Sequence, residues 1–182
     1  FLQGRIVTTR SHESVVNEAK TITQMPNFKG YIHDVGGPTA NFRRAACDKQ
    51  LKVGTCVGRQ CLFPKPCPNM VVDHTDYISL LREIRALPKV KKVFVRSGLR
   101  YDYIMADHSD AFLRELCQYH VSGQLKVAPE HCVAGVLDYM GKPHFDVFLK
   151  FWRQYQKLNE EGGTEQYLVP YLMSSHPGCT LS

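Results

Sequence analysis

The 182-residue sequence lacks a long apolar run, a long run of like charges and an even set of cysteines. A membrane helix needs roughly 18 consecutive apolar residues, so we expect a soluble protein without membrane contact. The net charge of +6 is spread over Arg43, Arg44, residues 89–92 and scattered lysines. Without a block of five or six like charges, a solvated basic surface is favoured over a nucleic-acid stripe, and a polyanionic partner stays open.

The seven cysteines form an odd set, and no secretory signal precedes them. The opening residues, FLQGRIVTTR, are too polar for a signal peptide, and they begin at Phe1 rather than at a methionine. We therefore expect a piece of a longer protein. Free thiols without an export signal favour a reducing compartment, so the expected location is the cytoplasm.

Helical and strand-like patterns alternate along the chain, which is long enough for one substantial core. Helices are predicted from Ser11 to about Met25, around residues 77–87, at 109–120, at 132–141, and over a long segment in which Phe145, Phe148, Trp152 and Tyr155 share a face. Strands are predicted within 29–37, 90–98, 124–131 and 166–178, the last made irregular by Pro170. This order predicts an α/β domain with a parallel sheet, either a barrel or a doubly wound fold.

Two serines are predicted to cap helices, because a serine side chain can accept a hydrogen bond from the first turn. They are Ser11 and Ser109, each just before an apolar helical pattern.

Polar or glycine-rich residues follow each predicted strand. They are Gly36-Gly37-Pro38-Thr39, Arg96-Ser97-Gly98, Pro129-Glu130-His131 and residues 174–178. Ligands of parallel α/β folds bind beyond the carboxyl ends of the strands, so we expect a site at this edge.

The connection between the first two strands is longer than the others and contains an insertion at about residues 41–72. It holds Cys47, Cys56, Cys61 and Cys67, separated by eight, four and five residues. A segment with few large apolar residues needs another source of stability, and a metal held by four thiolates would provide it. The spacing lacks the paired CxxC of zinc ribbons, so zinc, an iron–sulfur cluster and unliganded thiols all stay open. Cys117, on an apolar helix face, is expected in the core.

Five strings occur in this order: GYIHDVGGPTANF, DHTDYISLLREIRALPKVKKVFVRSGLRYDY, VSGQLKVAPEHC, VLDYMGKP and YLVPYLMSSHPGCT. Together they closely resemble the YgiQ-like radical S-adenosylmethionine proteins, over essentially the whole chain. The resemblance implies a partial TIM-like (β/α)6 barrel, of which this chain supplies about four βα units and is incomplete at both ends.

The family implies an enzyme in which a CxxxCxxC loop holds a 4Fe–4S cluster and S-adenosylmethionine binds the unique iron. One electron, supplied by a reductant such as flavodoxin or ferredoxin, cleaves S-adenosylmethionine to methionine and a 5′-deoxyadenosyl radical. The 182 residues contain no CxxxCxxC, so this chain alone is expected to be inactive. The four cysteines of the insertion are then candidates for an auxiliary cluster or a zinc site.

The resemblance also assigns roles at the strand ends. Gly36, Gly37, Pro38 and Thr39 resemble the two-glycine turn that approaches the methionine amino group, although the usual carboxylate is absent from Pro38 and Thr39.

The next two strand ends are assigned in the same way. Arg96 and Ser97 are placed to meet the methionine carboxylate or the ribose. Glu130 and His131 are candidates for ribose or substrate contact and for catalysis, and Lys126 is expected on the same strand face as Glu130.

The substrate is not indicated by these residues. VAPEHCVAGVLDYMGKP also looks like a segment of radical S-adenosylmethionine methylthiotransferases, so RNA is one candidate. The alternative class is a non-enzymatic module in which zinc braces the insertion and the basic surface binds RNA. A missing first strand would leave an unpaired sheet edge, through which we expect dimerisation or aggregation.

Overall fold

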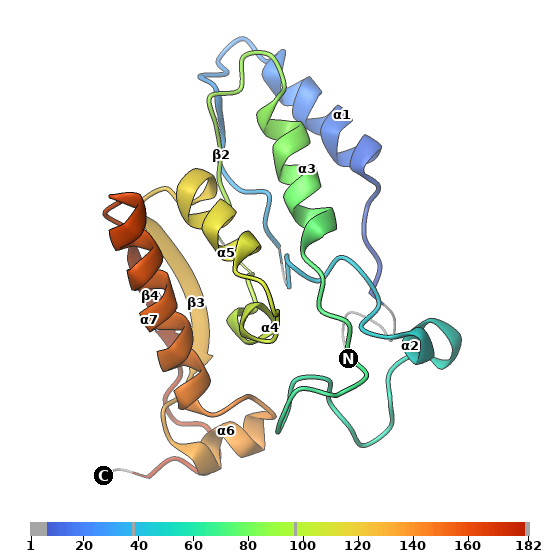
Figure 1. The fold of residues 1–182 in the computed structure, drawn as a ribbon, viewed down its shortest axis with the longest axis vertical. Coiled ribbons are helices and arrows are strands. Elements are labelled where there is room, and N and C mark those ends of the chain that lie inside the picture. The colour runs from blue at the N-terminus through green and yellow to red at the C-terminus, as the bar shows by residue number, and fades with distance from the viewer. Residues whose placement is uncertain (1–6, 38, 97, 181–182) are drawn as a thin grey trace.

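The computed structural model describes residues 7–37, 39–96 and 98–180 (Figure 1). Helices and short strands alternate along the chain, and each strand pair is parallel, β1 with β2 and β3 with β4. The described residues thus combine helices with two parallel strand pairs, where the sequence predicted a parallel sheet. The elements are α1 (His12–Thr23), β1 (Tyr31–Ile32), α2 (Asp48–Val53), α3 (Thr75–Arg85), β2 (Lys92–Val93), α4 (Tyr101–Met105), α5 (Ala111–Glu115), the π-helix η1 (Leu116–His120), β3 (Gln124–Glu130), α6 (Ala134–Met140), α7 (Phe145–Gly162) and β4 (Tyr167–Leu172).

A buried histidine joins the two strand pairs. The backbone N–H of Val95, just after β2, donates to the carbonyl of His120 at 2.9 Å. The His120 ring lies fully buried, and its Nδ1 is 2.8 Å from the carbonyl oxygen of Val93. Strand β2 is thus fastened to the turn of η1 that leads into β3.

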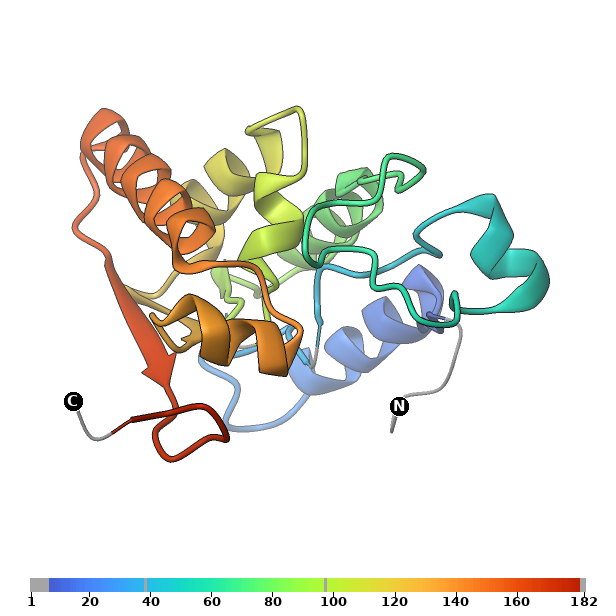
Figure 2. The same cartoon turned by 90° about the horizontal axis from the view of Figure 1, so that it is seen from below.

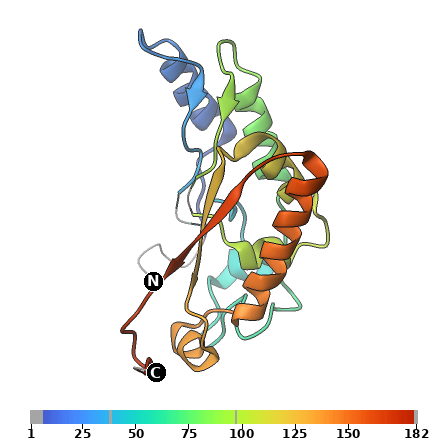
Figure 3. The same ribbon diagram turned by 90° about the vertical axis from the view of Figure 1, so that its left-hand side faces the viewer.

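One face of the strands is covered by helices and forms the core. Leu125 and Val127 of β3 are buried, whereas the alternate residue Lys126 is exposed. Helix α7 lies along the side of β3 and β4 that carries this core (Figure 3). In the described part of the chain the other face is left open, because Tyr167 and Tyr171 of β4 are 57% and 60% exposed. A sheet with one covered and one open face is compatible with part of a barrel wall.

Strand β4 carries the predicted irregularity at Pro170. Pro170 lies opposite Val127, and the register with β3 then shifts before Glu130 reaches Leu172. Proline has no backbone N–H to donate, so the ladder is interrupted near its end.

The helix patterns were predicted well in the core and less well at the ends. Ser11 is the N-cap of α1, since its side chain accepts from the N–H of Ser14, but α1 ends at Thr23 rather than near Met25. Ser109 Oγ accepts from the N–H of Ala111, the first residue of α5, as predicted, but Asp110 rather than Ser109 occupies the N-cap position. Trp152 was also wrongly placed inside, because it is 38% exposed and Phe151 is the buried aromatic.

Two short helices were not predicted. Helix α2 lies inside the insertion and buries only Gln50, so it has too little apolar periodicity to be recognised. Helix α4 follows β2 and buries Tyr101, Tyr103 and Ile104 within 5 residues, too short a segment for an apolar period to be recognised. Figure 2 shows α2 and its flanking loops standing apart from the main body of helices.

Within the described residues, no helix combines the length and the apolar character needed to cross a membrane.

Candidate ligand site at the carboxyl ends of the strands

The loops that follow β1 and β2 are tied together by one carboxylate. Oδ1 of Asp34 accepts from the backbone N–H of Gly36 at 2.8 Å and from that of Arg96 at 3.0 Å. The geometry therefore brings the predicted two-glycine turn and the predicted Arg96 to one place. Gly37 has φ of 151°, and a Cβ added there would meet nothing within 4 Å, so open space lies beside this turn.

A second tie follows the first. Ala40 N donates to Gly98 O at 2.9 Å, and the fully buried Asn41 pairs with the backbone of Arg100 in both directions. Arg100 N donates to Asn41 Oδ1 at 2.9 Å, while Asn41 Nδ2 donates to Arg100 O at 3.1 Å. The two loops are thus joined along their length, as far as the start of the insertion.

His74 forms a hydrogen bond with Asn41 and so holds the side chain of this second tie in place. Its Nε2 lies 3.3 Å from Asn41 Nδ2 and its Nδ1 lies 2.6 Å from Asp107, so Nε2 accepts and Nδ1 donates. The ring also stacks on Phe112, with centroids 4.4 Å apart. Burial lowers the pKa of His74 below its ordinary value, against the opposing effect of Asp107. The neutral ring is therefore the form that fits.

Glu130 ends β3 in an unusual backbone conformation. Its φ is +67°, a left-handed value that costs a residue with a side chain of this size about 1 kcal/mol or more. Lys142 Nζ donates to Glu130 Oε1 at 2.9 Å and to Ala128 O at 3.0 Å. The other carboxylate oxygen, Oε2, is buried and has no hydrogen-bond partner among the residues that the structure describes. A buried oxygen left in this way is ready to accept a hydrogen bond from a ligand.

His131 faces the segment that follows β4. The N–H of Val133 donates to His131 Nδ1 at 3.0 Å, so the neutral ring carries its proton on Nε2. That nitrogen lies 3.5 Å from Cys179 Sγ. Met173 N also donates to Glu130 O at 2.7 Å. The loops after β3 and β4 are therefore joined to each other, as are those after β1 and β2.

The other predicted ligand residues are placed less tightly. Lys126 and Glu130 lie on the same, less buried face of β3, as predicted. The side chain of Glu130 forms its ion pair with Lys142, in the loop after α6. The Arg96 side chain is exposed, with its guanidinium 5.8 Å from the Phe94 ring centroid. Thr39 has φ of 55° and accepts from Phe42 N through its carbonyl. Pro38 and Ser97 lie outside the described residues.

The four cysteines of the insertion come near one another without forming a ligand cage. Burial raises the pKa of the Cys61 thiol, and the nearby thiols of Cys67, Cys47 and Cys56 raise it further, in that order. Cys67 N donates to Cys61 O at 2.8 Å. Among the described residues, however, no group of three or more His, Cys, Asp or Glu side chains is arranged to hold a metal ion. Cys117 is 4% exposed, as expected for a core thiol, and burial raises its pKa to about 12.

The insertion also reaches the Glu130 side of the site. Gly141 ends α6 in the left-handed conformation, and a Cβ added there would lie 2.3 Å from Gln60 Nε2. Gln60 lies between Cys56 and Cys61, and Gly141 directly precedes Lys142. The cysteine loop is thus packed next to the Lys142–Glu130 pair.

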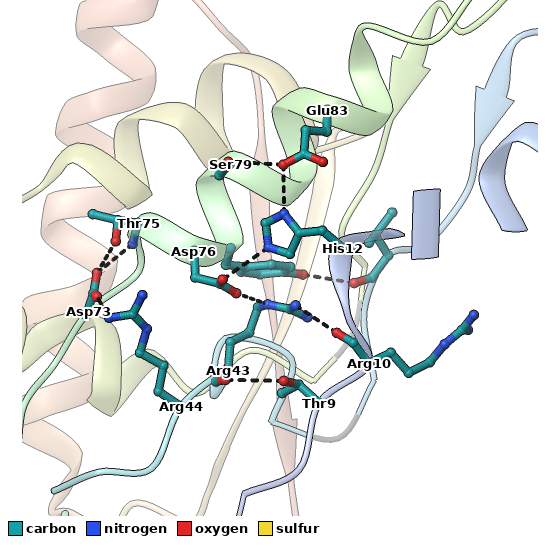
Figure 4. Close-up of polar contacts among 12 residues, drawn as sticks. Thr9, Arg10, His12, Arg43, Arg44, Asp73, Thr75, Asp76, Ser79 and Glu83 are labelled. Carbon is teal, nitrogen blue, oxygen red and sulfur yellow. Dashed lines mark hydrogen bonds and ion pairs between the residues drawn. The ribbon is translucent and has the colours of Figure 1, made fainter. Parts of the chain in front are cut away.

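Charged side chains close the α1 end of the site (Figure 4). The imidazole of His12 lies between two carboxylates of α3, with Nε2 3.1 Å from Asp76 and Nδ1 2.7 Å from Glu83. Arg43 also pairs with Asp76 and donates to the carbonyl of Arg10 at 3.2 Å. Burial acts to raise the pKa of Asp76, but Arg43 and His12 lower it below its ordinary value. Both helices and the start of the insertion are joined by these ion pairs.

Sequence reasoning missed the residues that hold the site together. Asp34 lies two residues before Gly36. An acidic residue at the end of a predicted strand was the signal that could have identified it as part of the site. Lys142 gave no local signal, because its partner Glu130 is 12 residues away.

Over its whole length the chain is similar to curated proteins from clostridia. It is 60% identical over 181 residues to a UPF0313 protein of Clostridium perfringens (strain SM101) and 58% identical to one of Clostridium botulinum (strain Okra). The chain is homologous to part of the UPF0313 proteins. It spans only 27% and 28% of the length of these two relatives, so most of a UPF0313 protein lies outside it. No protein-family model and no solved structure matches the chain.

Proposed function

We propose that the longer UPF0313 protein is a radical S-adenosylmethionine enzyme and that this chain forms part of its barrel wall and cofactor site. The five strings of the sequence support the class. The parallel strands with one open face and the clustered strand ends are compatible with it. The proposal depends on one observation: the backbone N–H groups of Gly36 and Arg96 both donate to the carboxylate of Asp34, and open space lies beside Gly37.

The residues at this edge fit S-adenosylmethionine. The Gly36-Gly37 turn offers backbone groups to an amino acid moiety, and Arg96 offers a guanidinium to its carboxylate. The buried Oε2 of Glu130 offers an acceptor to a ribose hydroxyl. When bound beside a reduced 4Fe–4S cluster, S-adenosylmethionine supplies a 5′-deoxyadenosyl radical. Because the chain has no CxxxCxxC, the cluster ligands belong to another part of the longer protein.

Measuring 5′-deoxyadenosine made by the longer UPF0313 protein tests this proposal. The anaerobically reconstituted protein is given S-adenosylmethionine and dithionite, and the product is measured by mass spectrometry. We expect product from the parent and about tenfold to 100-fold less from Glu130→Gln, since a hydrogen bond to a charged group contributes about 1.5–3 kcal/mol. Glu160→Gln, on the exposed side of α7, is the matched control and is expected to match the parent. No product from a cluster-loaded parent would contradict the proposal.

We further propose that Cys47, Cys56, Cys61 and Cys67 hold an auxiliary metal, either a zinc ion or an iron–sulfur cluster. The mutual effect of the four thiols on Cys61 and the small apolar content of α2 support this. Val71 N donates to Ala46 O at 2.8 Å and closes the base of the loop that carries the four thiols.

A further inference from the structure

A groove lies on the cysteine lobe, which we define as residues 47–70. Its volume is about 880 Å³, and the residues that line it lie between Cys56 and Pro68. Phe63 and the three prolines of the lobe give the groove an apolar lining, whereas Arg59 and Lys65 add two cationic side chains. A groove with this lining fits a ligand that presents both apolar and negatively charged groups.

The basic side chains of the lobe have no acidic partner. The lobe contains four basic residues and one acidic residue, so it has a net charge of +3, half of the chain's +6. The basic residues are Lys49, Lys52, Arg59 and Lys65. All four are exposed, and none of them forms an ion pair within the described residues. Just before the lobe, in contrast, Arg43 pairs with Asp76 and Arg44 with Asp73. Unpaired positive charge that gathers on one surface attracts an acidic partner.

The apolar residues of the lobe favour a polypeptide over RNA as that partner. Leu51, Val53 and Val57 are 65%, 64% and 97% exposed, so aliphatic side chains lie on the surface among the lysines. Single-stranded RNA is bound by stacking its bases on aromatic side chains. The lobe has one aromatic residue, Phe63, and its ring is half-buried. Exposed aliphatic groups beside unpaired cations match a protein segment that carries carboxylates and apolar side chains.

The groove borders the candidate ligand site. Gln60 lines the groove and also lines the cavity that contains the Gly36-Gly37 turn. The same side chain occupies the space beside Gly141, next to the Lys142–Glu130 pair. A segment bound in the groove therefore lies at the edge of the strand-end site.

We propose that this groove binds an acidic segment of a second protein. Carboxylates of the segment pair with Arg59 and Lys65, and its apolar side chains pack on Phe63 and the neighbouring prolines. Lys49 and Lys52 of α2 add to the attraction at longer range. The inference concerns binding, and it holds whether or not the proposed enzymatic activity is correct.

Fluorescence anisotropy of a labelled glutamate–alanine copolymer, titrated with the longer UPF0313 protein, tests the proposal. We expect binding that weakens as NaCl is added, since salt screens exposed charges. Arg59→Glu combined with Lys65→Glu is expected to bind about tenfold more weakly, because two attractions become repulsions. Lys20→Glu combined with Arg153→Glu makes the same charge change on exposed positions of α1 and α7 and is the matched control. The control is expected to bind like the parent, and all proteins are compared at equal metal content.

Arg59→Gln combined with Lys65→Gln is used if the charge-reversed protein does not fold, and it is expected to bind about threefold more weakly. No binding by the parent overturns the proposal, whether the groove is empty or covered by a second copy or another part of the longer protein. Equal binding by a folded lobe variant and the control also overturns it. An oligouridine of the same charge that binds more tightly than the copolymer, and only when Arg59 and Lys65 are present, would make the groove an RNA site and overturn the polypeptide.

Discussion

Replacing Asn41 by leucine is expected to be among the most destabilising single changes in this chain. Asn41 is fully buried and joins the Arg100 backbone to His74. Leucine has a similar size but cannot hydrogen-bond. Three groups then lose their partner: the N–H of Arg100, the carbonyl of Arg100 and Nε2 of His74.

The size of the effect follows from these three groups. A buried polar group left without a partner costs about 1–3 kcal/mol. Arg100 is partly exposed, so its carbonyl can be reached by water and contributes at the low end. We expect a loss of about 3–5 kcal/mol, a large share of the roughly 5–15 kcal/mol that stabilises a typical domain.

Urea unfolding of the 182-residue chain, followed by circular dichroism, measures this loss. Asn41→Leu is expected to lower the midpoint with little change in the slope of free energy against urea. Asn17→Leu, on the exposed side of α1, is the matched control and is expected to change stability by no more than about 0.5 kcal/mol. A loss below about 1 kcal/mol for Asn41→Leu would refute the reasoning that this tie holds the two loops.

Three further predictions follow from other contacts. Burial lowers the pKa of His74 below its ordinary value of 6.5, so the neutral ring stabilises the fold above pH 6.5 and this stabilisation is lost as the pH falls below that value. His74→Gln is expected to make the free energy of unfolding, measured with urea, less dependent on pH between 6.5 and 5. The same pH dependence in parent and variant contradicts this. Gly141→Ala is expected to destabilise the protein by about 1–2 kcal/mol, because φ of Gly141 is +65° and Gln60 occupies the space where a Cβ would lie. Gly135→Ala, in open space within α6, is expected to stabilise it by up to about 1 kcal/mol. Equal melting temperatures of the two variants would count against this prediction. Replacing all four of Cys47, Cys56, Cys61 and Cys67 by serine is expected to remove either one zinc or about four irons with matching sulfide after anaerobic reconstitution, and equal metal content in parent and variant would rule out the auxiliary site.

The sequence predicted the elements that have a strong apolar period. Tyr77, Leu80, Leu81 and Ile84 of α3 are all buried, and the four strands lie where alternation and β-branched residues indicated. Trp152 was misplaced because Phe151 and Trp152 are adjacent and large, and the period cannot decide which of two neighbours faces inward. Short elements such as α2 are too small for a period to be detected at all.

The candidate site was predicted in outline and not in its connections. The carboxylate of Asp34 brings Gly36 and Arg96 together as the sequence predicted, whereas Glu130 ends a strand of the other pair. The shared acceptor on Asp34 and the Lys142–Glu130 pair depend on contacts between segments 62 and 12 residues apart, which no local pattern encodes. Within the described residues, the lack of a partner for Oε2 of Glu130 follows from its burial, which depends on the folded structure and not on any local sequence pattern.

The hydrogen bonds between Asn41 and Arg100 mark the boundary between loop segments of fixed length and segments whose length can vary. From Asp34 to Asn41 every few residues are bonded to the loop after β2, so an insertion or deletion in either loop would pull the other out of step. After Asn41, the Phe42 ring still packs edge-on against Tyr103, and Val71 then bonds back to Ala46. Residues 47–70 therefore leave and rejoin the domain at nearly one point. We expect homologues to differ in the length of this lobe without altering the spacing of the strand ends, as long as the contact of Gln60 with Gly141 is kept.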